Sequence, residues 1–304
     1  MRRLDRIYAF AATVALLAAL GAARAEDTLK LAIGQHGNWE NSAPELGQRM
    51  GFFKKHGLTL DLFYTQGSGE TMQVVIAGSA DIGIGVGTNS AMAAFARGAP
   101  VLALANHTTG APAAYWYVPA NSPIKSFKNL NGKTVAFSTT GSSNHTALLQ
   151  FAKLNGVSPK PVATGNPAST FTQAMSGQVD VGWSSPPFGL QAAEEGKIRI
   201  IGHGSDVPAL RTQTVRLQIT NKTAYAQKKD ALDRYIAAYR ETLDWMYSDP
   251  AALKMYSDWV KIPERIAGRM RDEFYPKDEL VPDRLAGIEA ITEEAIAFKY
   301  LKAP

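Results

Sequence analysis

The sequence predicts a two-lobed α/β protein in which each lobe is a mainly parallel sheet flanked by helices, with a helical C-terminal region on the first lobe. Three observations lead to this prediction. The motif AGSADIGIGV at 77–86 has a near copy, SGQVDVGWS, at 176–184. Each copy closes a run of strand, helix, strand, helix and strand, and such runs imply parallel strands joined by helical crossovers. The chain of 304 residues is long enough for two separate cores.

The first 25 residues have the features of a secretory signal peptide. Three arginines within the first six residues precede an apolar stretch at 7–20, and residues 23–25 are Ala-Arg-Ala. The apolar stretch of 14 residues is shorter than a transmembrane helix requires. We expect cleavage before Glu26 and a periplasmic location for the mature chain. The pair Arg2-Arg3 leaves the export route, general or twin-arginine, open.

Composition argues against several classes of function. Removing residues 1–25 takes away four Arg and one Asp, which lowers the formal net charge from +5 to +2. Without a basic stripe the mature chain is not expected to bind nucleic acid. Cysteine is absent, which rules out a thiol nucleophile, an iron–sulfur cluster and a cysteine zinc site. The five histidines lack paired metal-binding spacing and no serine-hydrolase motif occurs, so we expect no cofactor, no metal and no enzymatic activity.

The first half of the mature chain alternates strands and helices. Strands are predicted at 29–34, 57–64 and 81–86, because these stretches are β-rich and begin or end at turn residues. One helix is expected near Pro44 and ends by Gly51 or a little later, and another runs from about Glu70 to Gly78. A further strand at 101–105 precedes a crossing into the second lobe near 110–115.

The second half repeats this order. Strands are predicted at 133–138, 161–165 and 179–184, with helices between them that stop at Gly156 and Gly177. The first strands of the two runs are 104 residues apart and the strands that contain Asp81 and Asp180 are 99 apart. These two aspartates stand at strand starts, so we expect them to fix a turn rather than bind a ligand. A strand at 198–206 follows, and the stretch 214–222 leads back to the first lobe.

The chain from 223 onward is predicted to be helical and to cover the first lobe. One apolar stripe at helical spacing contains Leu232, Tyr235, Ile236, Tyr239, Leu243 and Met246, and a second contains Ile288, Ile291, Ala295 and Phe298. Prolines 250, 263 and 282 are expected to mark helix starts. The aromatic residues Trp245, Tyr256 and Trp259 are expected to pack in the core rather than line a site.

Six loops at the carboxyl ends of the predicted strands are the candidate ligand-binding region. They are GQHGNWENS, TQGSGE and GVGTNS in the first lobe and STTGSSN, TGNPAST and WSSPP in the second. Ligands of open α/β sheets bind at these ends, where helix N-termini present unpaired N–H groups and partial positive charge. Any one loop could equally be a helix cap alone. Because the loops form two matched sets, one in each lobe, we expect them to face a shared cleft and to bind a ligand mainly through backbone amides.

Four side chains in or near these loops allow two interpretations each. Trp39 and Trp183 could flank a flat ligand or pack in the core. Glu40 could bind a ligand amine or hydroxyl, or face water. His145 could donate to a ligand or lie on a solvated helix face.

Several stretches, in this order, resemble the nitrate/sulfonate/taurine-type substrate-binding proteins of ABC importers, a family that also includes binders of thiamine-precursor pyrimidines. They are GFFKKHGLTLDL, IAGSADIGIGV, RGAPV, NLNGKTVAFSTTGSSN and SGQVDVGWSSPP, and the likeness runs from about 30 to 220. The resemblance implies a hinged, type II periplasmic binding protein. Lobe one would comprise 26–112 and 215–304 and lobe two 113–214, with crossings near 110–115 and 210–216.

By analogy with that family, the loops carry the ligand contacts. The candidates are Asn38, Trp39, Glu40, Gln66, Gly67, Ser68, Gly69, Gly87, Thr88, Asn89, Thr139, Thr140, Gly141, Ser142, Asn166, Trp183 and Ser184. No arginine in these loops commits the site to a sulfonate. The resemblance implies a monomer that captures a small anionic or polar organic solute and delivers it to an ABC permease driven by its ATPase. An aromatic or pyrimidine solute, a sensory role and an exported enzyme of similar fold remain alternatives.

Overall fold

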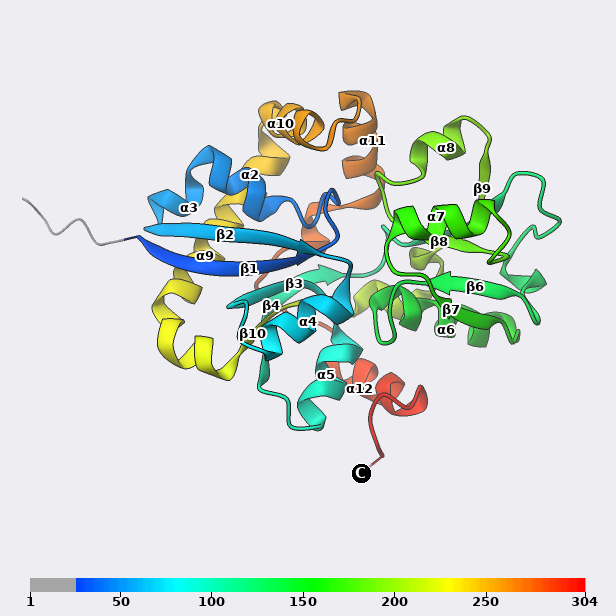
Figure 1. The fold of residues 1–304 in the computed structure, drawn as a ribbon, viewed down its shortest axis with the longest axis horizontal. Helices are drawn as coiled ribbons and strands as arrows, with labels where there is room; N and C mark the ends of the chain where they lie inside the picture. The colour runs from blue at the N-terminus through cyan, green and yellow to red at the C-terminus, as the bar shows by residue number, and fades with distance from the viewer. Residues whose placement is uncertain (1–25, 304) are drawn as a thin grey trace, which may run out of the picture.

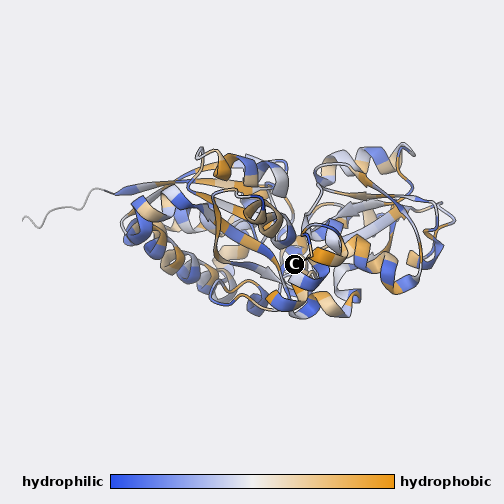
Figure 2. Ribbon diagram, turned by 90° about the horizontal axis from the view of Figure 1, so that it is seen from below, coloured by the Kyte–Doolittle hydropathy of each residue, from blue (hydrophilic) through white to orange (hydrophobic). Residues whose placement is uncertain are grey.

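The computed structural model describes residues 26–303, and the predicted signal peptide lies outside the described residues. Two lobes lie beside each other along the long axis of the molecule (Figures 1 and 2). Each lobe has its own sheet and its own buried apolar core. In the described part of the chain, no helix combines the length and the apolar character that crossing a membrane requires.

The sheet of lobe one has five strands in the order β2-β1-β3-β10-β4. Its members are β1 (Asp27–Gly34), β2 (Leu58–Thr65), β3 (Ile82–Gly87), β4 (Val101–Thr109) and β10 (Thr214–Asn221). The three strands of the first predicted run are parallel, whereas β10 pairs antiparallel with both β3 and β4. The strand that returns from lobe two therefore completes the sheet of lobe one.

The sheet of lobe two repeats this arrangement. Its strands are β5 (Tyr115–Pro119), β6 (Thr134–Phe137), β7 (Lys160–Ala163), β8 (Gly182–Ser184) and β9 (Ile198–His203). β6 and β7 are parallel, β5 is antiparallel to β8 and β9, and one parallel bridge between Val135 and Val181 joins the two groups. The resulting order β7-β6-β8-β5-β9 matches lobe one strand for strand. This confirms the predicted fold, with one antiparallel insertion in each sheet.

Helices flank both sheets. They are α2 (Ala43–Met50), α3 (Phe52–Lys55), α4 (Ser68–Ile76), α5 (Thr88–Ala96), α6 (Ser143–Asn155), α7 (Pro167–Met175) and α8 (Leu190–Glu194), with 3-10 turns at Phe127–Asn129, Gly204–Asp206, Pro208–Thr212 and Lys277–Glu279. Gly51 and Gly156 end α2 and α6 in the left-handed conformation, with φ of 80° and 62°. Glycine adopts this conformation without steric cost, which explains why both helix ends were predictable.

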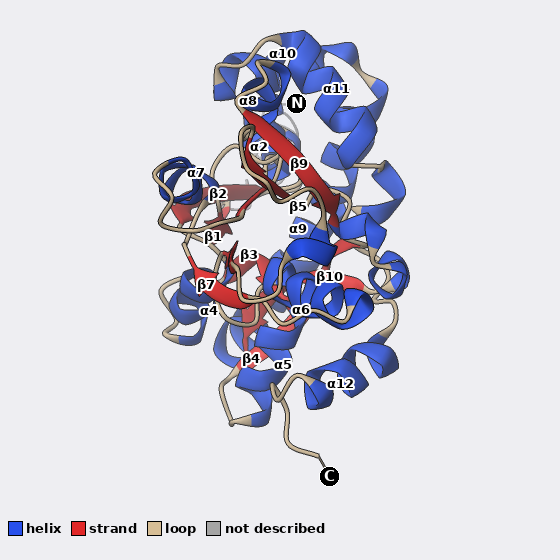
Figure 3. Cartoon of the chain, turned by 90° about the vertical axis from the view of Figure 1, so that its right-hand side faces the viewer, coloured by secondary structure: helices blue, strands red, loops and turns tan. Residues whose placement is uncertain are grey.

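The C-terminal helices are α9 (Lys222–Ser248), α10 (Pro250–Val260), α11 (Glu264–Phe274) and α12 (Ile288–Ala297). The predicted stripe of α9 is largely buried in the core of lobe one. Figure 3, seen from the lobe-two end, shows α10 and α11 at the opposite end of the molecule from α12, which packs on α5.

Prolines 250 and 263 stand at helix starts as predicted, but Pro282 does not. The Pro282 carbonyl accepts a hydrogen bond from the Asn106 N–H of β4, and the Ala286 carbonyl accepts one from the Thr214 N–H. These bonds hold the segment against the sheet, so α12 begins only after Gly287.

The duplicated aspartates fix the same corner in each lobe, as predicted. The Asp81 carboxylate accepts a hydrogen bond from the Lys30 N–H of β1 at 2.9 Å, and the Asp180 carboxylate accepts one from the Thr134 N–H of β6 at 2.8 Å. Each aspartate thus ties the start of the third strand to the first strand. The repeated motif is therefore a structural device that sets the register of both sheets.

Candidate functional site

The lobes meet where the N-termini of α4 and α5, from lobe one, face the N-terminus of α6, from lobe two. A Cβ placed on Gly87 would lie 2.5 Å from the carbonyl oxygen of Gly141, so the two backbones are in close contact. Asn89 on α5 donates a hydrogen bond to the Thr146 hydroxyl on α6 at 3.0 Å. The chain crosses between the lobes after Thr109 and returns before Thr214, so the contact lies beside both crossings.

A narrow polar chamber lies between these helix ends. Its lining residues are Gly34, Gln35, Gly67, Ser68, Gly85, Ser138, Ser142, Ser143, Asn144 and Arg216. The chamber has a volume of about 10 Å³, which is room for roughly one water molecule. The first N–H groups of α4 and α6 have no carbonyl one turn earlier to accept their hydrogen bonds, and they carry the partial positive charge of a helix start.

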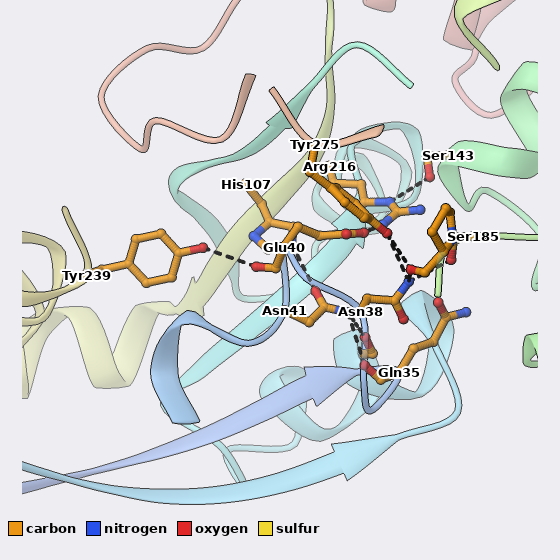
Figure 4. Close-up of polar contacts among 12 residues, drawn as sticks. Gln35, Asn38, Glu40, Asn41, His107, Ser143, Ser185, Arg216, Tyr239 and Tyr275 are labelled. Atoms are coloured by element: carbon orange, nitrogen blue, oxygen red, sulfur yellow. Dashed lines mark hydrogen bonds and ion pairs between the residues drawn. The ribbon is translucent and has the colours of Figure 1, made fainter. Parts of the chain in front are cut away.

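Arg216 supplies the full positive charge of the chamber. It projects from β10, a strand whose residues are all buried, and its guanidinium forms an ion pair with Glu40 (Figure 4). Its Nε donates to the Ser143 hydroxyl of lobe two at 2.8 Å. One guanidinium therefore links a lobe-one carboxylate to a lobe-two helix start.

A second layer of polar contacts supports this ion pair (Figure 4). Asn41 is hydrogen-bonded to His107 Nε2 at 2.9 Å, and burial lowers the pKa of His107 to about 3, which keeps its imidazole neutral beside Arg216. Across the lobes, Asn38 donates to the Ser185 hydroxyl at 2.6 Å, and Tyr275 donates to the Pro186 carbonyl at 2.7 Å. Asn38 thus holds the loop after β1 against lobe two, and Tyr275 holds the segment after α11 against the same part of lobe two.

A wider cavity of about 290 Å³ opens beside the chamber, at the rim of the cleft. It is lined by Gln35, His36, Tyr64, Thr65 and Gln66 of lobe one and by Asn166, Pro167, Ala168 and Phe188 of lobe two. Gln35 lines both spaces and has a φ of 68°, an uncommon conformation for a residue other than glycine. The Asn166 amide donates to the Gln66 side chain across the rim.

Most of the residues predicted from the loops lie at this junction. Gly67, Ser68 and Ser142 line the chamber, and Gln66 and Asn166 line the rim cavity. Gly69, Gly87, Asn89, Thr139, Thr140 and Gly141 lie in or beside the lobe–lobe contact: a Cβ on Gly69 would meet Thr139 at 3.5 Å, and the Thr140 carbonyl accepts from the Ser90 hydroxyl. The structure thus brings these two matched sets of loops together.

Six predicted residues lie elsewhere. Trp39 is fully buried in the core of lobe one and Trp183 in the core of lobe two. Each indole N–H donates a hydrogen bond within its own lobe, to the hydroxyls of Tyr247 and Thr164, so neither needs a ligand as its partner. The prediction that they flank a ligand is therefore not carried into the proposed site.

The other four are engaged within the protein. Thr88 donates to the Thr214 carbonyl at 2.5 Å and lines a separate small cavity, and Ser184 donates to the Phe188 carbonyl at 3.0 Å inside lobe two. Asn38 and Glu40 are buried beside the chamber, where Asn38 joins the lobes and Glu40 pairs with Arg216. His145 is half-buried: its ring stacks on Phe137 with centroids 4.1 Å apart, and its Nδ1 contacts the Tyr300 hydroxyl.

Sequence reasoning missed Arg216, whereas Gln35, Ser138 and Asn144 lie in the predicted loops GQHGNWENS and STTGSSN but were not singled out there. The signal for Arg216 was present: it is the one charged residue in the return strand TVRLQITN, and a charge in a buried strand needs a partner or a function. Within residues 26–303, no cluster of His, Asp and Glu has the composition and spacing to hold a metal ion.

Comparisons with known proteins agree with this architecture. A family model described as "NMT1/THI5 like" matches residues 43–253, more than half of the chain. No curated protein sequence matches the chain.

Several solved structures share the fold. The alkanesulfonate-binding protein SsuA of Xanthomonas axonopodis pv. citri, bound to MOPS, is 18% identical, with 88% of this chain and 89% of that chain covered and a TM-score of 0.75. The nitrate-binding protein NrtA of Synechocystis PCC 6803 is 16% identical, with 91% and 82% covered and a TM-score of 0.72. The CA3427 gene product of Candida albicans, described as having the generic periplasmic binding protein fold, is 16% identical, with 91% and 92% covered and a TM-score of 0.73.

Proposed function

The chain belongs to the NMT1/THI5-like family, and from this premise we propose that it is an extracytoplasmic solute-binding protein that captures a small organic anion between its lobes for an ABC importer. The permease and its ATPase would be its partners, and the mature chain would act as a periplasmic monomer. The similar solved structures include binding proteins for alkanesulfonates and for nitrate, which supports an anionic solute.

The observation that carries this proposal is the position of Arg216. Its guanidinium and the N-termini of α4 and α6 line one chamber, so a full positive charge and two partial ones converge on the same point. Hydroxyl and amide groups of Ser138, Ser142 and Asn144 add neutral polar contacts. A sulfonate or carboxylate group has the acceptor oxygens that such a set of donors binds.

Binding between the lobes would be coupled to closure. In the structure the chamber admits roughly one water molecule, so an anion would enter while the lobes are apart and be enclosed when they come together. Arg216 already reaches Ser143 across the gap, which shows how one side chain can contact both lobes. An anion bound to Arg216 and to the start of α6 would stabilise the closed form, because it binds that form better.

We propose binding rather than catalysis because of the chemistry of the lining. The residues that line the chamber contribute hydroxyl, amide and guanidinium groups and backbone N–H groups, and none of them is a carboxylate or a histidine. A general base is therefore missing from this set, and a hydrolytic or transfer reaction would need one.

A second candidate solute is an aromatic or pyrimidine compound. It is favoured by the rim cavity, where His36 and Tyr64 lie with ring centroids 4.7 Å apart and Phe188 forms the opposite wall. Aromatic walls of this kind bind flat rings by stacking.

The test is a ligand screen on the mature protein, residues 26–304. Melting temperature and calorimetric affinity would be measured with nitrate, methanesulfonate, taurine, benzoate and an aminopyrimidine, for the wild type and for Arg216→Gln. An anion present at 100 times its dissociation constant should stabilise the wild type by about 2.7 kcal/mol and the variant much less. Stabilisation by the aminopyrimidine alone would favour the second candidate. Stabilisation by none of the five would contradict the proposal.

A further inference from the structure

A second pocket lies next to the rim cavity, formed by lobe two and open to solvent on one side. It has a volume of about 490 Å³ and is lined by Tyr117, Pro167, Ala168, Phe171, Ser184, Phe188, Gly189, Gln191, Ala192, Glu195 and Lys197. Pro167, Ala168 and Phe188 line both cavities, so the two spaces share a wall. We call this lobe-two space the side pocket.

The walls of the side pocket are mostly apolar. Phe171 on α7 packs against Tyr117 on β5 with ring centroids 6.3 Å apart, and Ala192 on α8 faces the same space. The charged groups Glu195 and Lys197 pair with each other at 2.6 Å and both residues are exposed. They therefore mark the solvent edge of the pocket, and its inner part is aromatic and aliphatic.

Ser184 and Tyr117 contribute the polar groups of the inner wall, and the Ser184 hydroxyl donates to the Phe188 carbonyl. Tyr117 differs from Ser184. Its hydroxyl is buried and has no hydrogen-bond partner among residues 26–303, whereas the neighbouring Tyr115 hydroxyl donates to the Phe188 carbonyl. An unsatisfied buried hydroxyl is costly and calls for an explanation. Burial also raises the pKa of Tyr117, so the hydroxyl stays protonated and keeps its capacity to donate.

Phe188 stands between the side pocket and the cleft. Its carbonyl accepts from the hydroxyls of Ser184, at 3.0 Å, and Tyr115, which fixes its backbone. Its ring lies against the loop after β1, because a Cβ placed on Gly37 would be 3.5 Å from the tip of the ring. The Phe188 ring therefore touches lobe one while it forms a wall of both cavities.

We propose that the side pocket binds the apolar part of a ligand whose anionic group binds at Arg216, so that the preferred solutes are sulfonates or carboxylates with an aryl or long alkyl group. This inference rests on the proposed function. The chamber, the rim cavity and the side pocket form a series: Gln35 lines the first two, and Pro167, Ala168 and Phe188 line the last two. An anion held in the chamber would direct its tail through the rim cavity toward Phe188 and the pocket behind it.

The volumes of the rim cavity and the side pocket, about 290 and 490 Å³, support a ligand with a large apolar group. Nitrate and methanesulfonate would leave both of them empty. Each methylene buried in an apolar pocket adds about fourfold to affinity. A ligand that reaches the side pocket should therefore bind far more tightly than one that fills the chamber alone.

The experiment compares methanesulfonate, butanesulfonate, octanesulfonate and naphthalene-2-sulfonate by calorimetry with three proteins. These are the wild type, Ala192→Phe, which fills the side pocket, and Ala163→Phe, which makes the same change at an exposed position of lobe two. We expect the wild type and Ala163→Phe to bind octanesulfonate or naphthalene-2-sulfonate at least about 100-fold more tightly than methanesulfonate. Ala192→Phe should lose most of that preference and keep its affinity for methanesulfonate.

The outcomes separate this inference from the proposed function. Binding of methanesulfonate with no gain for the longer sulfonates, or a gain that Ala192→Phe leaves intact, would overturn the side pocket while the anion-binding function stands. Failure of every sulfonate to bind the wild type would overturn both. Circular dichroism and the melting temperature would establish that Ala192→Phe is folded, and its affinity for methanesulfonate provides a second check.

Discussion

Arg216 and Glu40 form an ion pair that is almost fully enclosed, with 11% and 1% of their side chains exposed. The pair comes from two distant parts of the chain, the return strand β10 and the loop after β1. Removing one partner from a buried pair leaves the other as an uncompensated charge, which costs more than the pair itself contributes. Glu40 therefore holds Arg216 in place, and its carboxylate partly offsets the charge that an anion would meet.

We predict that Arg216→Met destabilises the protein and abolishes anion binding, by separable mechanisms. The Glu40 carboxylate would be left buried without its partner, at a cost of about 3–5 kcal/mol in the free energy of unfolding. The double variant Arg216→Met, Glu40→Gln removes that charge and should recover most of the stability. Its affinity for anions should stay about 10- to 100-fold below that of the wild type, because the charge-assisted contact is lost. Urea denaturation and calorimetry measure the two effects, and wild-type affinity in the double variant would exclude Arg216 from the site.

A methyl group at Gly87 should hold the lobes apart. The φ and ψ of Gly87, −59° and 130°, suit alanine, so the backbone is not strained by the change. The new Cβ would lie 2.5 Å from the Gly141 carbonyl oxygen of lobe two and must displace it. We expect ligand affinity to fall by about 10- to 100-fold, the equivalent of an overpacking cost of 1–3 kcal/mol. With saturating ligand, small-angle scattering should show a larger radius of gyration for Gly87→Ala than for the wild type.

Gly268→Ala is the matched control for this prediction. On α11 the added Cβ would meet Leu253 at 3.9 Å and nothing nearer, so it fits without displacement. Alanine is also the better helix former by about 1 kcal/mol, so a slight gain in stability with unchanged affinity is expected. Equal affinities for Gly87→Ala and the wild type would show that closure does not depend on this contact.

The fold was predictable because its main features are local and are repeated. The glycines that end helices, Gly51 and Gly156, and the repeated motifs around Asp81 and Asp180 are signals of a few residues each, and they appear in matched order. The place of β10 was harder to foresee. Its insertion between β3 and β4 is a long-range pairing of strands that lie more than a hundred residues apart in the sequence.

Only the part of the site formed by the loops at the strand ends could be predicted from the sequence. Loops at the ends of parallel strands face the cleft by topology, and Gly67, Ser68 and Ser142 were placed there by that rule. The rule does not reach Arg216, because its strand enters the sheet from the other lobe. It also fails for Trp39, which lies in a loop but turns into the core, and for Trp183, which lies in the middle of β8 and faces the core of lobe two.

Stability should fall as the pH drops from about 6.5 to 4, in part because of His145. Burial lowers the pKa of His145 to about 4, and its Nδ1 accepts a hydrogen bond from the Gly141 N–H at 3.2 Å. The unfolded chain takes up this proton near pH 6.5, whereas the folded chain does so only near the lowered pKa, so acid favours unfolding across that interval. His145→Gln should give a flatter dependence of unfolding free energy on pH there. An unchanged slope in urea titrations at pH 7, 6, 5 and 4.5 would contradict this account.

Glu279 should have the opposite effect from His145, because it should lower the stability of the protein as the pH rises. Burial raises the pKa of Glu279 to about 7, its Oε2 has no partner within the described residues, and a Cβ on Gly110 at the first crossing would lie 3.2 Å from its carboxylate. As the pH rises through 4.5 the unfolded chain loses this proton first, so stability is lost between pH 4.5 and about 7. Glu279→Gln removes the ionisation and should therefore be more stable than the wild type at pH 8 and equally stable at pH 4.5.

A comparison with Glu273→Gln isolates burial as the cause of this effect. Glu273 is exposed on α11 and pairs with Arg269 at 3.0 Å, and exposed pairs of this kind contribute roughly 0–1 kcal/mol. Its replacement should leave the pH 8 stability nearly unchanged or slightly lower, whereas Glu279→Gln should raise it. If both variants changed the free energy of unfolding at pH 8 by the same amount, a general charge effect would account for the result. A gain confined to Glu279→Gln, and absent at pH 4.5, requires a carboxyl group that folding keeps from ionising.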